Sequence, residues 1–298
     1  MVYVYGLAAA CLLGLGFVLQ QRAAERAPVA DVLSFRLLLD LVRVPLWLAG
    51  IGFMIAGQIV SVFALAHGEL SRVEPLLGTS LLFAMALARR LTGLRLGWTG
   101  WIGVVLLSGG VAAFMIAGQP YSSTALGGPL RHWLVVGIVL GVALVLVVLA
   151  RRLAGSAEPP LLAAAAGALY GLQDALTRTS SDIFDSGALP GLLSSWQPYA
   201  VVALALTGLL LVQSAFELGP LHMSLPTLTA TEPLVGIACG IGFLGDRLLV
   251  TPVALVGEAL GLGAIVFGVF LLGRHPMLPA GAHRENGAQN GVEDSEVP

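Results

Sequence analysis

The sequence predicts an all-α polytopic membrane protein built from two inverted repeats, with about nine transmembrane helices. Of its 298 residues, 57% are hydrophobic and 11% are charged, and the mean hydropathy is +0.91. Soluble domains carry roughly 25% charged residues, so this composition excludes a soluble globular protein. Apolar runs recur along the chain, each long enough to cross or nearly cross a bilayer. The two halves of the chain also resemble each other, which indicates a duplication.

Nine apolar runs are candidate spanning helices. The first starts at Val2 without a preceding basic region, so we interpret it as a membrane span and not as a cleaved signal peptide. In chain order the runs are 2–19, 46–66, 73–88, 98–117, 133–150, 160–177, 198–216, 221–245 and 252–272.

The segment 28–44, between the first two runs, predicts an amphipathic helix that lies in the membrane interface. Arg36, Asp40 and Arg43 fall on one helical face, and the leucines fall on the other. A short tenth span is the alternative. The segment 186–197 occupies the corresponding place in the second half.

The arginines in the loops predict the orientation of the chain. With nine spans, eleven arginines lie on one side and four on the other, which places the N-terminus outside and the C-terminus in the cytoplasm. A tenth span would remove this uneven distribution of arginines between the two sides of the membrane. We expect the plasma (inner) membrane of a bacterium. The larger set is Arg22, Arg26, Arg36, Arg43, Arg89, Arg90, Arg95, Arg151, Arg152, Arg274 and Arg284, and the smaller is Arg72, Arg131, Arg178 and Arg247.

Three pairs of stretches repeat at an offset of 151 to 154 residues. The extra helix 133–150 between the copies places corresponding helices five crossings apart, so the second copy is inverted, as in many secondary transporters. The pairs are GLGFVLQ at 14–20 with GALYGLQ at 167–173, AHGEL at 66–70 with ELGPL at 217–221, and GVVLLSGG at 103–110 with GEALGLGA at 257–264.

The predicted organisation has four parts. A first repeat at 1–118 is followed by a linker at 119–158 that holds the extra helix, a second repeat at 159–273 and a tail at 274–298. The tail loses apolar residues and gains Gly, Pro, Asn and acids, which predicts a disordered cytoplasmic segment.

The run 221–245 carries the most unusual residues of the sequence. Glu232 lies near its middle, where a charged group costs at least about 2.5 kcal/mol and therefore indicates a functional site. Pro226 and Pro233 each remove a backbone N–H, which predicts a broken helix that lines a cavity. The alternative is a protonated Glu232 that hydrogen-bonds to a neighbouring helix. At the 151 offset, Leu81 corresponds to Glu232, so the proposed site is asymmetric.

Thr229, Gly236 and Gly240 share a helical face with Glu232. They predict a polar groove beside the carboxylate, and the two glycines also let another helix approach closely. Gly137-xxx-Gly141 and Gly257-xxx-Gly261 are predicted to be further helix-packing positions.

Other acids in the spans are candidates for substrate binding or coupling. Asp174 and Glu258 lie in the outer parts of their spans, and Glu74 begins 73–88 from the same side. Around a common cavity they would lead cations toward Glu232, which with Asp174 is a candidate metal ligand. Taken singly, Asp174 is better explained as an ordinary interfacial or helix N-terminal acid, and for Glu74 the two interpretations are equally supported.

Gln20 and Gln173 occupy equivalent positions in the two copies. Their amides could ligate a cation or hydrogen-bond between helices. Cys11 and Cys239 lie in apolar spans without CxxC spacing and are interpreted as buried thiols.

The sequence contains no catalytic signature, so we expect neither enzymatic activity nor a cofactor. A net charge of −2 and the lack of any RNA- or DNA-binding motif exclude nucleic acid as a partner. The expected partners are the lipid bilayer and a small cation or small-molecule substrate, and a homodimer remains open.

The chain resembles the drug/metabolite transporter superfamily and its EamA-like domains. The resemblance rests on the duplication, on ALAHGELSRVEPLL at 64–77 and on LPTLTATEPLVGIACGIGFLGDRL at 225–248. The second stretch ends in a turn, Gly245 to Leu248, that is similar to the Gly-Glu-Arg-Leu-type turn of EamA-like helices. The first half departs from this pattern, since it reads Ala-Arg-Arg-Leu at 88–91. The order of elements, GFVLQQR and LWLAG are also similar to the NIPA-type magnesium transporters.

This resemblance implies transport by alternating access but does not fix the substrate. The acidic residues favour a cation, with Mg²⁺ the sharpest version, because Mg²⁺ keeps several waters and needs only one or two carboxylates. One alternative is a proton-coupled exporter of small organic solutes, with Tyr170, Trp196 or Tyr199 along the route. Another is a membrane scaffold that transports nothing.

Overall fold

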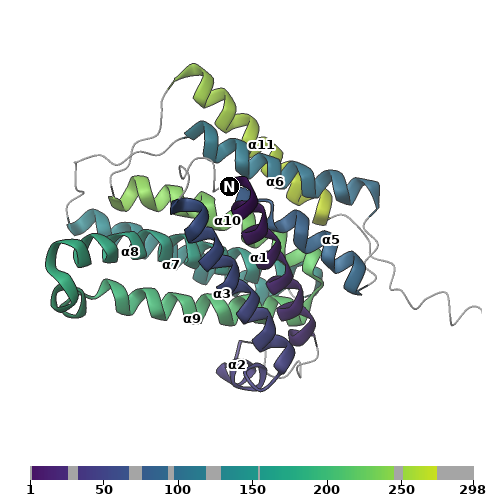
Figure 1. Cartoon of the computed structure of the whole chain (residues 1–298), viewed down its shortest axis with the longest axis horizontal. Helices are drawn as coiled ribbons and strands as arrows, with labels where there is room; N and C mark the ends of the chain where they lie inside the picture. Colours follow the sequence, from purple (N-terminus) through teal and green to yellow (C-terminus); the bar gives the residue numbers. More distant parts are fainter. Residues whose placement is uncertain are drawn as a thin grey trace, which may run out of the picture.

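The computed structural model describes residues 2–25, 33–66, 76–92, 97–118, 129–153, 155–244 and 251–273, and all regular elements in these ranges are helices (Figure 1). Within these described ranges, six helices are long and apolar enough to cross a membrane. The predicted class, an all-α multi-pass membrane protein, is therefore confirmed. The six are α1 (Val2–Ala24), α3 (Pro45–Ala66), α6 (Trp98–Gly118), α7 (Pro129–Leu153), α9 (Gln197–Leu218) and α11 (Pro252–Gly273).

Three predicted spans differ from the expected form, so the count of nine crossings stays a prediction. α5 (Ser80–Thr92) has 13 residues and ends four residues after the predicted run. α8 (Glu158–Ser194) has 37 residues and includes much of the segment expected to be separate at 186–197. α10 (Leu221–Cys239) has 19 residues and is followed by a π-helical segment, Gly240–Leu244. The predicted tail lies outside the described residues.

The interfacial segment forms only a short helix in the part that the structure describes. α2 (Phe35–Leu41) has seven residues, about 10 Å of helix, which cannot cross a bilayer. The tenth span is therefore not supported by residues 33–44. As predicted, Arg36 and Asp40 are exposed, whereas Leu37 and Leu41 are buried in a small cluster with Trp47.

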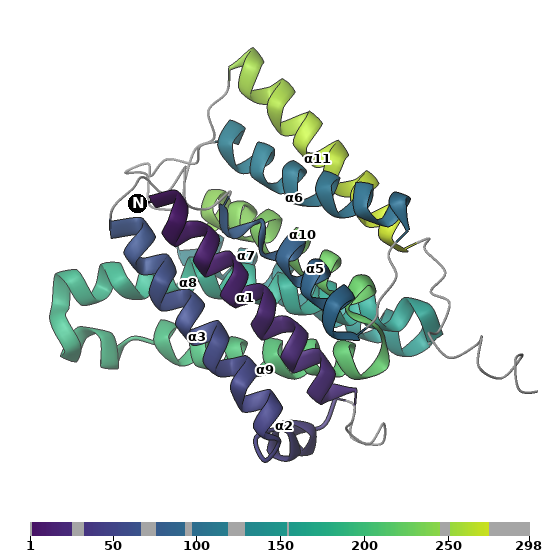
Figure 2. The ribbon, with the colours of Figure 1, turned by 45° about the vertical axis from the view of Figure 1, so that its right-hand side comes forward.

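The last turns of α8 bend away from its axis before the chain returns in α9 (Figure 2). Pro190 has no N–H to donate to the preceding turn, which is a common cause of a kink. Further back, four hydroxyl groups donate to carbonyls one turn earlier, a pattern that also bends helices. They belong to Thr177, Thr179, Ser180 and Ser181.

Helix pairs of the first half recur in the second half. α1 packs on α3 and α5, and α8 packs on α9 and α10. At Gly14 on α1, a Cβ would lie 2.8 Å from both the Ser80 carbonyl oxygen and the Ala84 nitrogen of α5. At Gly167 on α8, it would lie 2.9 Å from the Leu228 carbonyl oxygen and 3.1 Å from the Glu232 nitrogen of α10. The two crossings thus have the same register.

This register corrects the residue equivalence expected from the sequence offset. Ala84, and not Leu81, occupies the position in α5 that Glu232 occupies in α10. The conclusion that the first half lacks a matching acid is unchanged, because neither residue is acidic.

α6 and α11 form an antiparallel pair at one edge of the molecule (Figures 1 and 2). A Cβ at Gly110 would lie 2.8 Å from the Gly261 carbonyl oxygen, and one at Gly268 would lie 2.8 Å from the Gly103 carbonyl oxygen. Gly257 faces Ala117 in the same seam. The packing role predicted for Gly257 and Gly261 is therefore confirmed.

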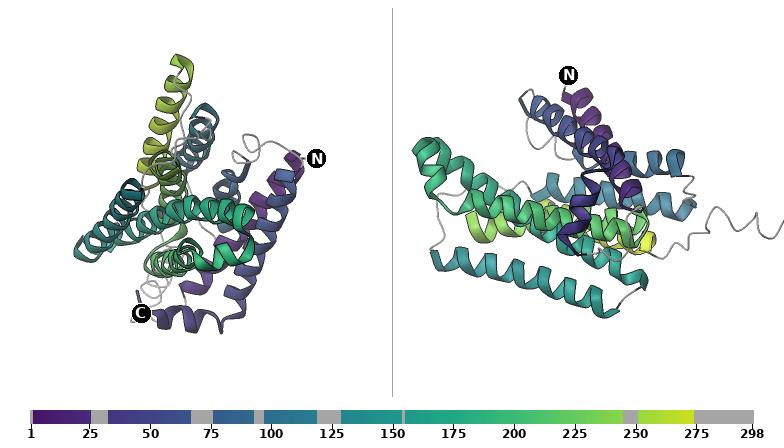
Figure 3. Two further views of the ribbon diagram at one scale, coloured as in Figure 1. Left: turned by 90° about the vertical axis from the view of Figure 1, so that its left-hand side faces the viewer. Right: turned by 90° about the horizontal axis from the view of Figure 1, so that it is seen from below.

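α7 is the extra helix, and it runs alongside the long helices of the second half, while α1 and α3 cross them obliquely (Figure 3). It packs along α8, and Arg151 near its end forms a 3.0 Å salt bridge with Glu158. The packing role predicted for Gly137 and Gly141 is wrong, because a Cβ at either position would meet nothing within 4 Å.

Candidate functional site

Glu232 lies where α8 and α10 are in close backbone contact. A Cβ at Gly171 would lie 2.6 Å from the Glu232 carbonyl oxygen and 2.6 Å from the Gly236 nitrogen. Gly167 and Gly171, four residues apart on α8, therefore form the surface on which the backbone of Glu232 rests. Gly236 therefore fills one of its two predicted roles, that of a small residue that lets another helix approach closely.

Two polar side chains of α8 accompany Glu232. Tyr170 and Asp174 are four residues apart and share a face of α8. The carboxyl groups of Asp174 and Glu232 lie near enough to repel each other when both are charged, and the Tyr170 hydroxyl lies near the carboxyl group of Glu232. Asp174 is exposed and Glu232 is half-buried, so the pair is not sealed inside the bundle. Asp174 follows Gly171, which touches the Glu232–Gly236 backbone, by one turn, so the two acids predicted to ligate a metal lie on adjoining turns of the α8–α10 contact.

Tyr170 is positioned by a glycine on α9. A Cβ at Gly208 would overlap Cε1 of the Tyr170 ring and lie 2.9 Å from its Cδ1. Only a residue without a side chain leaves room for the ring at this place. Three helices of the second half therefore build the site.

The corresponding place in the first half is apolar or neutral. At the offset of 153, Tyr170, Gly171 and Asp174 correspond to Phe17, Val18 and Gln21. Val18 is fully buried and belongs to the main hydrophobic core, as do Leu81, Ala84 and Met85. Among the described residues, the acidic pair therefore belongs to the second half, and the matching place of the first half offers at most the amide of Gln21.

α10 is not broken at its prolines, contrary to the prediction. It is a continuous α-helix through Pro226 and Pro233, and the irregular part is the π-helical segment that follows Cys239. The Thr229 hydroxyl donates to the Leu225 carbonyl at 2.9 Å and to the Pro226 carbonyl at 3.2 Å. The hydroxyl is thus committed to the backbone beside the prolines, and its donor does not point into a groove.

Replacing Pro233 with alanine tests whether the missing backbone bond matters. Alanine restores the N–H that can donate to the Thr229 carbonyl, so we expect the thermal stability to stay equal or rise. We expect transport to fall several-fold, because the local freedom of α10 next to Glu232 is lost. Thermal unfolding and uptake should be measured together, and full activity in Pro233→Ala would contradict a functional role for the proline.

Gln20 lies in a buried amide pair between the two halves. Gln213 Nε2 donates to Gln20 Oε1 at 2.6 Å, and Gln20 Nε2 contacts the sulfur of Met54. This is the cross-helix hydrogen bond that was the alternative to a cation ligand for Gln20. Gln173 is half-buried on α8, and its Oε1 is buried without a hydrogen-bond partner among the described residues.

Glu258 lies on the α6–α11 pair and not on the α8–α10 pair. Its position falls on the same helical face as Ala254, Gly261 and Ile265, which are buried in this pair. Glu74 lies outside the described residues. Of the predicted row of acids, the described structure therefore groups only Asp174 with Glu232.

The described residues contain no group of three His, Cys, Asp or Glu side chains that could hold a metal ion. Two carboxylates are nevertheless compatible with Mg²⁺, which retains several waters in most protein sites.

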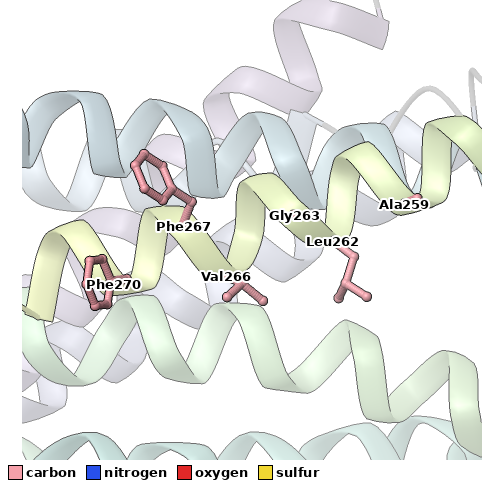
Figure 4. A pocket seen from close by; sticks show the side chains of 6 residues that line it. All are labelled: Ala259, Leu262, Gly263, Val266, Phe267 and Phe270. Atoms are coloured by element: carbon pink, nitrogen blue, oxygen red, sulfur yellow. The ribbon is translucent and has the colours of Figure 1, made fainter.

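Two clefts lie away from Glu232. One of about 560 Å³ is lined by apolar residues of α11 alone (Figure 4). The other, of about 470 Å³, lies between α8 and α9 and is lined in part by Thr177, Ser180 and Ser181. Neither is the cavity that the sequence predicted beside the carboxylate.

Sequence reasoning missed two features of the site. The spacing Gly167-xxx-Gly171 was visible as a small-residue motif but was used only to detect the repeat. The contact between Tyr170 and Gly208 left no signal in the sequence, because it joins two helices through the tertiary structure.

Among known proteins, the chain is similar to an uncharacterized protein of Corynebacterium glutamicum. The two are 29% identical over 283 residues, which cover 94% of this chain and 97% of the relative. No family model matches the chain. No solved structure matches it.

Proposed function

We propose that the protein is a secondary transporter or facilitator of the drug/metabolite type, which moves a small cation across a bacterial plasma membrane by alternating access. The observation that carries this proposal is the pair of Asp174 and Glu232 at the α8–α10 crossing. Acids inside a membrane bundle are costly, and they usually mark an ion or substrate pathway.

The arrangement of helix pairs supports alternating access. The α1–α5 and α8–α10 crossings share one register, although only the second carries acids. Related halves of this kind can rock against each other around a site, as they do in inverted-repeat transporters. Mg²⁺ is the most specific candidate for the substrate, because two carboxylates and bound waters are sufficient to coordinate it.

One observation favours a second candidate. The ring of Tyr170 lies beside the acids, and an aromatic face next to carboxylates suits an organic cation. A proton-coupled exporter of small organic solutes would use Glu232 to exchange a proton for the substrate.

Uptake into proteoliposomes tests the proposal and separates the candidates. We expect protein-dependent entry of Mg²⁺, and we expect Glu232→Gln to reduce it at least tenfold. The organic exporter would instead show proton-driven movement of an organic cation, with the same loss in Glu232→Gln.

The matched control is Glu258→Gln, the same chemical change on α11, which should retain most of the activity. Normal transport by Glu232→Gln would remove Glu232 from the mechanism. A wild-type protein that moves none of these substrates would favour the scaffold.

A further inference from the structure

The first turns of α7 contact the end of α10. Arg131 Nη2 donates a 2.8 Å hydrogen bond to the carbonyl of Ile241, in the π-helical segment Gly240–Leu244. The C-terminal end of a helix exposes unpaired carbonyls and a partial negative charge, so a guanidinium is stabilising there. Val135, one turn along α7, fills the space above Gly242, where a Cβ would lie 2.9 Å from its Cγ2.

The same turns of α7 also contact the connection between α8 and α9. Trp133 stacks on Trp196, with ring centroids 4.9 Å apart and an angle of 21° between the ring planes. Trp196 is the residue that directly precedes α9. Three residues of α7 therefore tie the end of α10 to the α8–α9 connection.

Cys239 directly precedes the π-helical segment that Arg131 and Val135 of α7 contact. It is the last residue of α10 and it is 0% exposed. From Cys239 to Glu232 is seven residues, about 10 Å along the helix. A route from this membrane face to Glu232 along α10 passes the π-helical segment and then Cys239.

We propose that Arg131, Trp133 and Val135 form a latch that holds Gly240–Leu244 against the bundle and closes one end of the α8–α10 site. Single-turn π-helical segments recur at functional sites. The role of the latch in transport rests on the proposed function, whereas its control of access to Cys239 does not. In the part of the chain that the structure describes, α7 packs on α8 and on Gly240–Leu244, so the latch acts on the half that carries the acids.

The native thiol provides the test. The full chain has two cysteines, so Cys11→Ser leaves Cys239 as the single reporter. Right-side-out and inverted vesicles are treated with a membrane-impermeant, charged maleimide, which reacts with a thiol that water reaches. In the Cys11→Ser background, Arg131→Ala combined with Trp133→Ala should raise the labelling rate of Cys239 at least tenfold from one membrane face only.

Two controls accompany the test. Trp98→Ala removes a tryptophan that is 82% exposed at the start of α6, and it should leave the rate unchanged. Trp133→Phe keeps an aromatic ring for stacking and should remain near the Cys11→Ser rate. If the double variant does not fold, the single variant Arg131→Gln should give a smaller increase from the same face.

An unchanged rate in the folded variants, or an equal increase from both faces, would overturn the latch, because the second result indicates general loosening. The labelling needs no substrate. One-sided opening in a protein that transports nothing would therefore leave the latch intact and refute the proposed function.

Discussion

Gly171→Ala is expected to lower the free energy of unfolding by about 1 to 3 kcal/mol, the usual cost of overpacking. The new Cβ would lie 2.6 Å from two backbone atoms of α10, the Glu232 oxygen and the Gly236 nitrogen. Backbone atoms cannot rotate away as a side chain can, so α8 and α10 must separate. Alanine is otherwise the better helix former by about 1 kcal/mol, so a loss of stability would oppose the helix propensity. Thermal unfolding in detergent measures the effect.

Gly137→Ala is the matched control. It makes the same substitution on α7, where the added Cβ meets nothing within 4 Å. It should leave the stability unchanged or raise it slightly. Equal unfolding temperatures for Gly171→Ala and Gly137→Ala would mean that the close α8–α10 contact at Glu232 is not present in solution.

Gly208→Ala should reduce uptake about tenfold with a smaller loss of stability than Gly171→Ala. The added methyl would overlap the ring of Tyr170, which is a side chain and can turn away. The ring would then leave its place near Glu232, and small displacements within a site can cost large factors in rate. Uptake and thermal unfolding measured on the same preparation separate the two effects.

Gly52→Ala on α3 is the control for this change, because its added Cβ meets nothing within 4 Å. Tyr170→Phe removes only the hydroxyl, so it shows whether the hydroxyl or the ring is needed. Wild-type uptake by Gly208→Ala would show that the position of Tyr170 does not affect transport.

The hydrophobic runs predicted the fold class, an all-α multi-pass membrane protein, because a helix must be long and apolar to cross a bilayer however it packs. α6 and α11 nearly match their predicted runs at 98–117 and 252–272. Charged and hydroxylated residues obscured the extent of α8, since its polar second part carries no apolar run that would predict a continuous helix.

Glu232 could be singled out as a candidate from the sequence, because a carboxylate within an apolar run is unusual on its own. Its neighbours were predictable only in part. Asp174 was identified as an acid in a span, whereas the close α8–α10 contact depends on how Gly171 meets Gly236. The prolines suggested a break, but a proline prevents one backbone bond and leaves the remaining helical bonds intact.

The restriction of the acids to one half has an electrical consequence. Asp174 and Glu232 both lie on helices of the second half, while Gln21 and Ala84 occupy the matching points of the first. In the proposed alternating-access cycle, the protein's own charge at the site would move with only one of the halves. An elementary charge that crosses the whole membrane potential is worth about 2.3 kcal/mol per 100 mV. Any voltage dependence of the unloaded protein should therefore arise from the motion of α8 and α10.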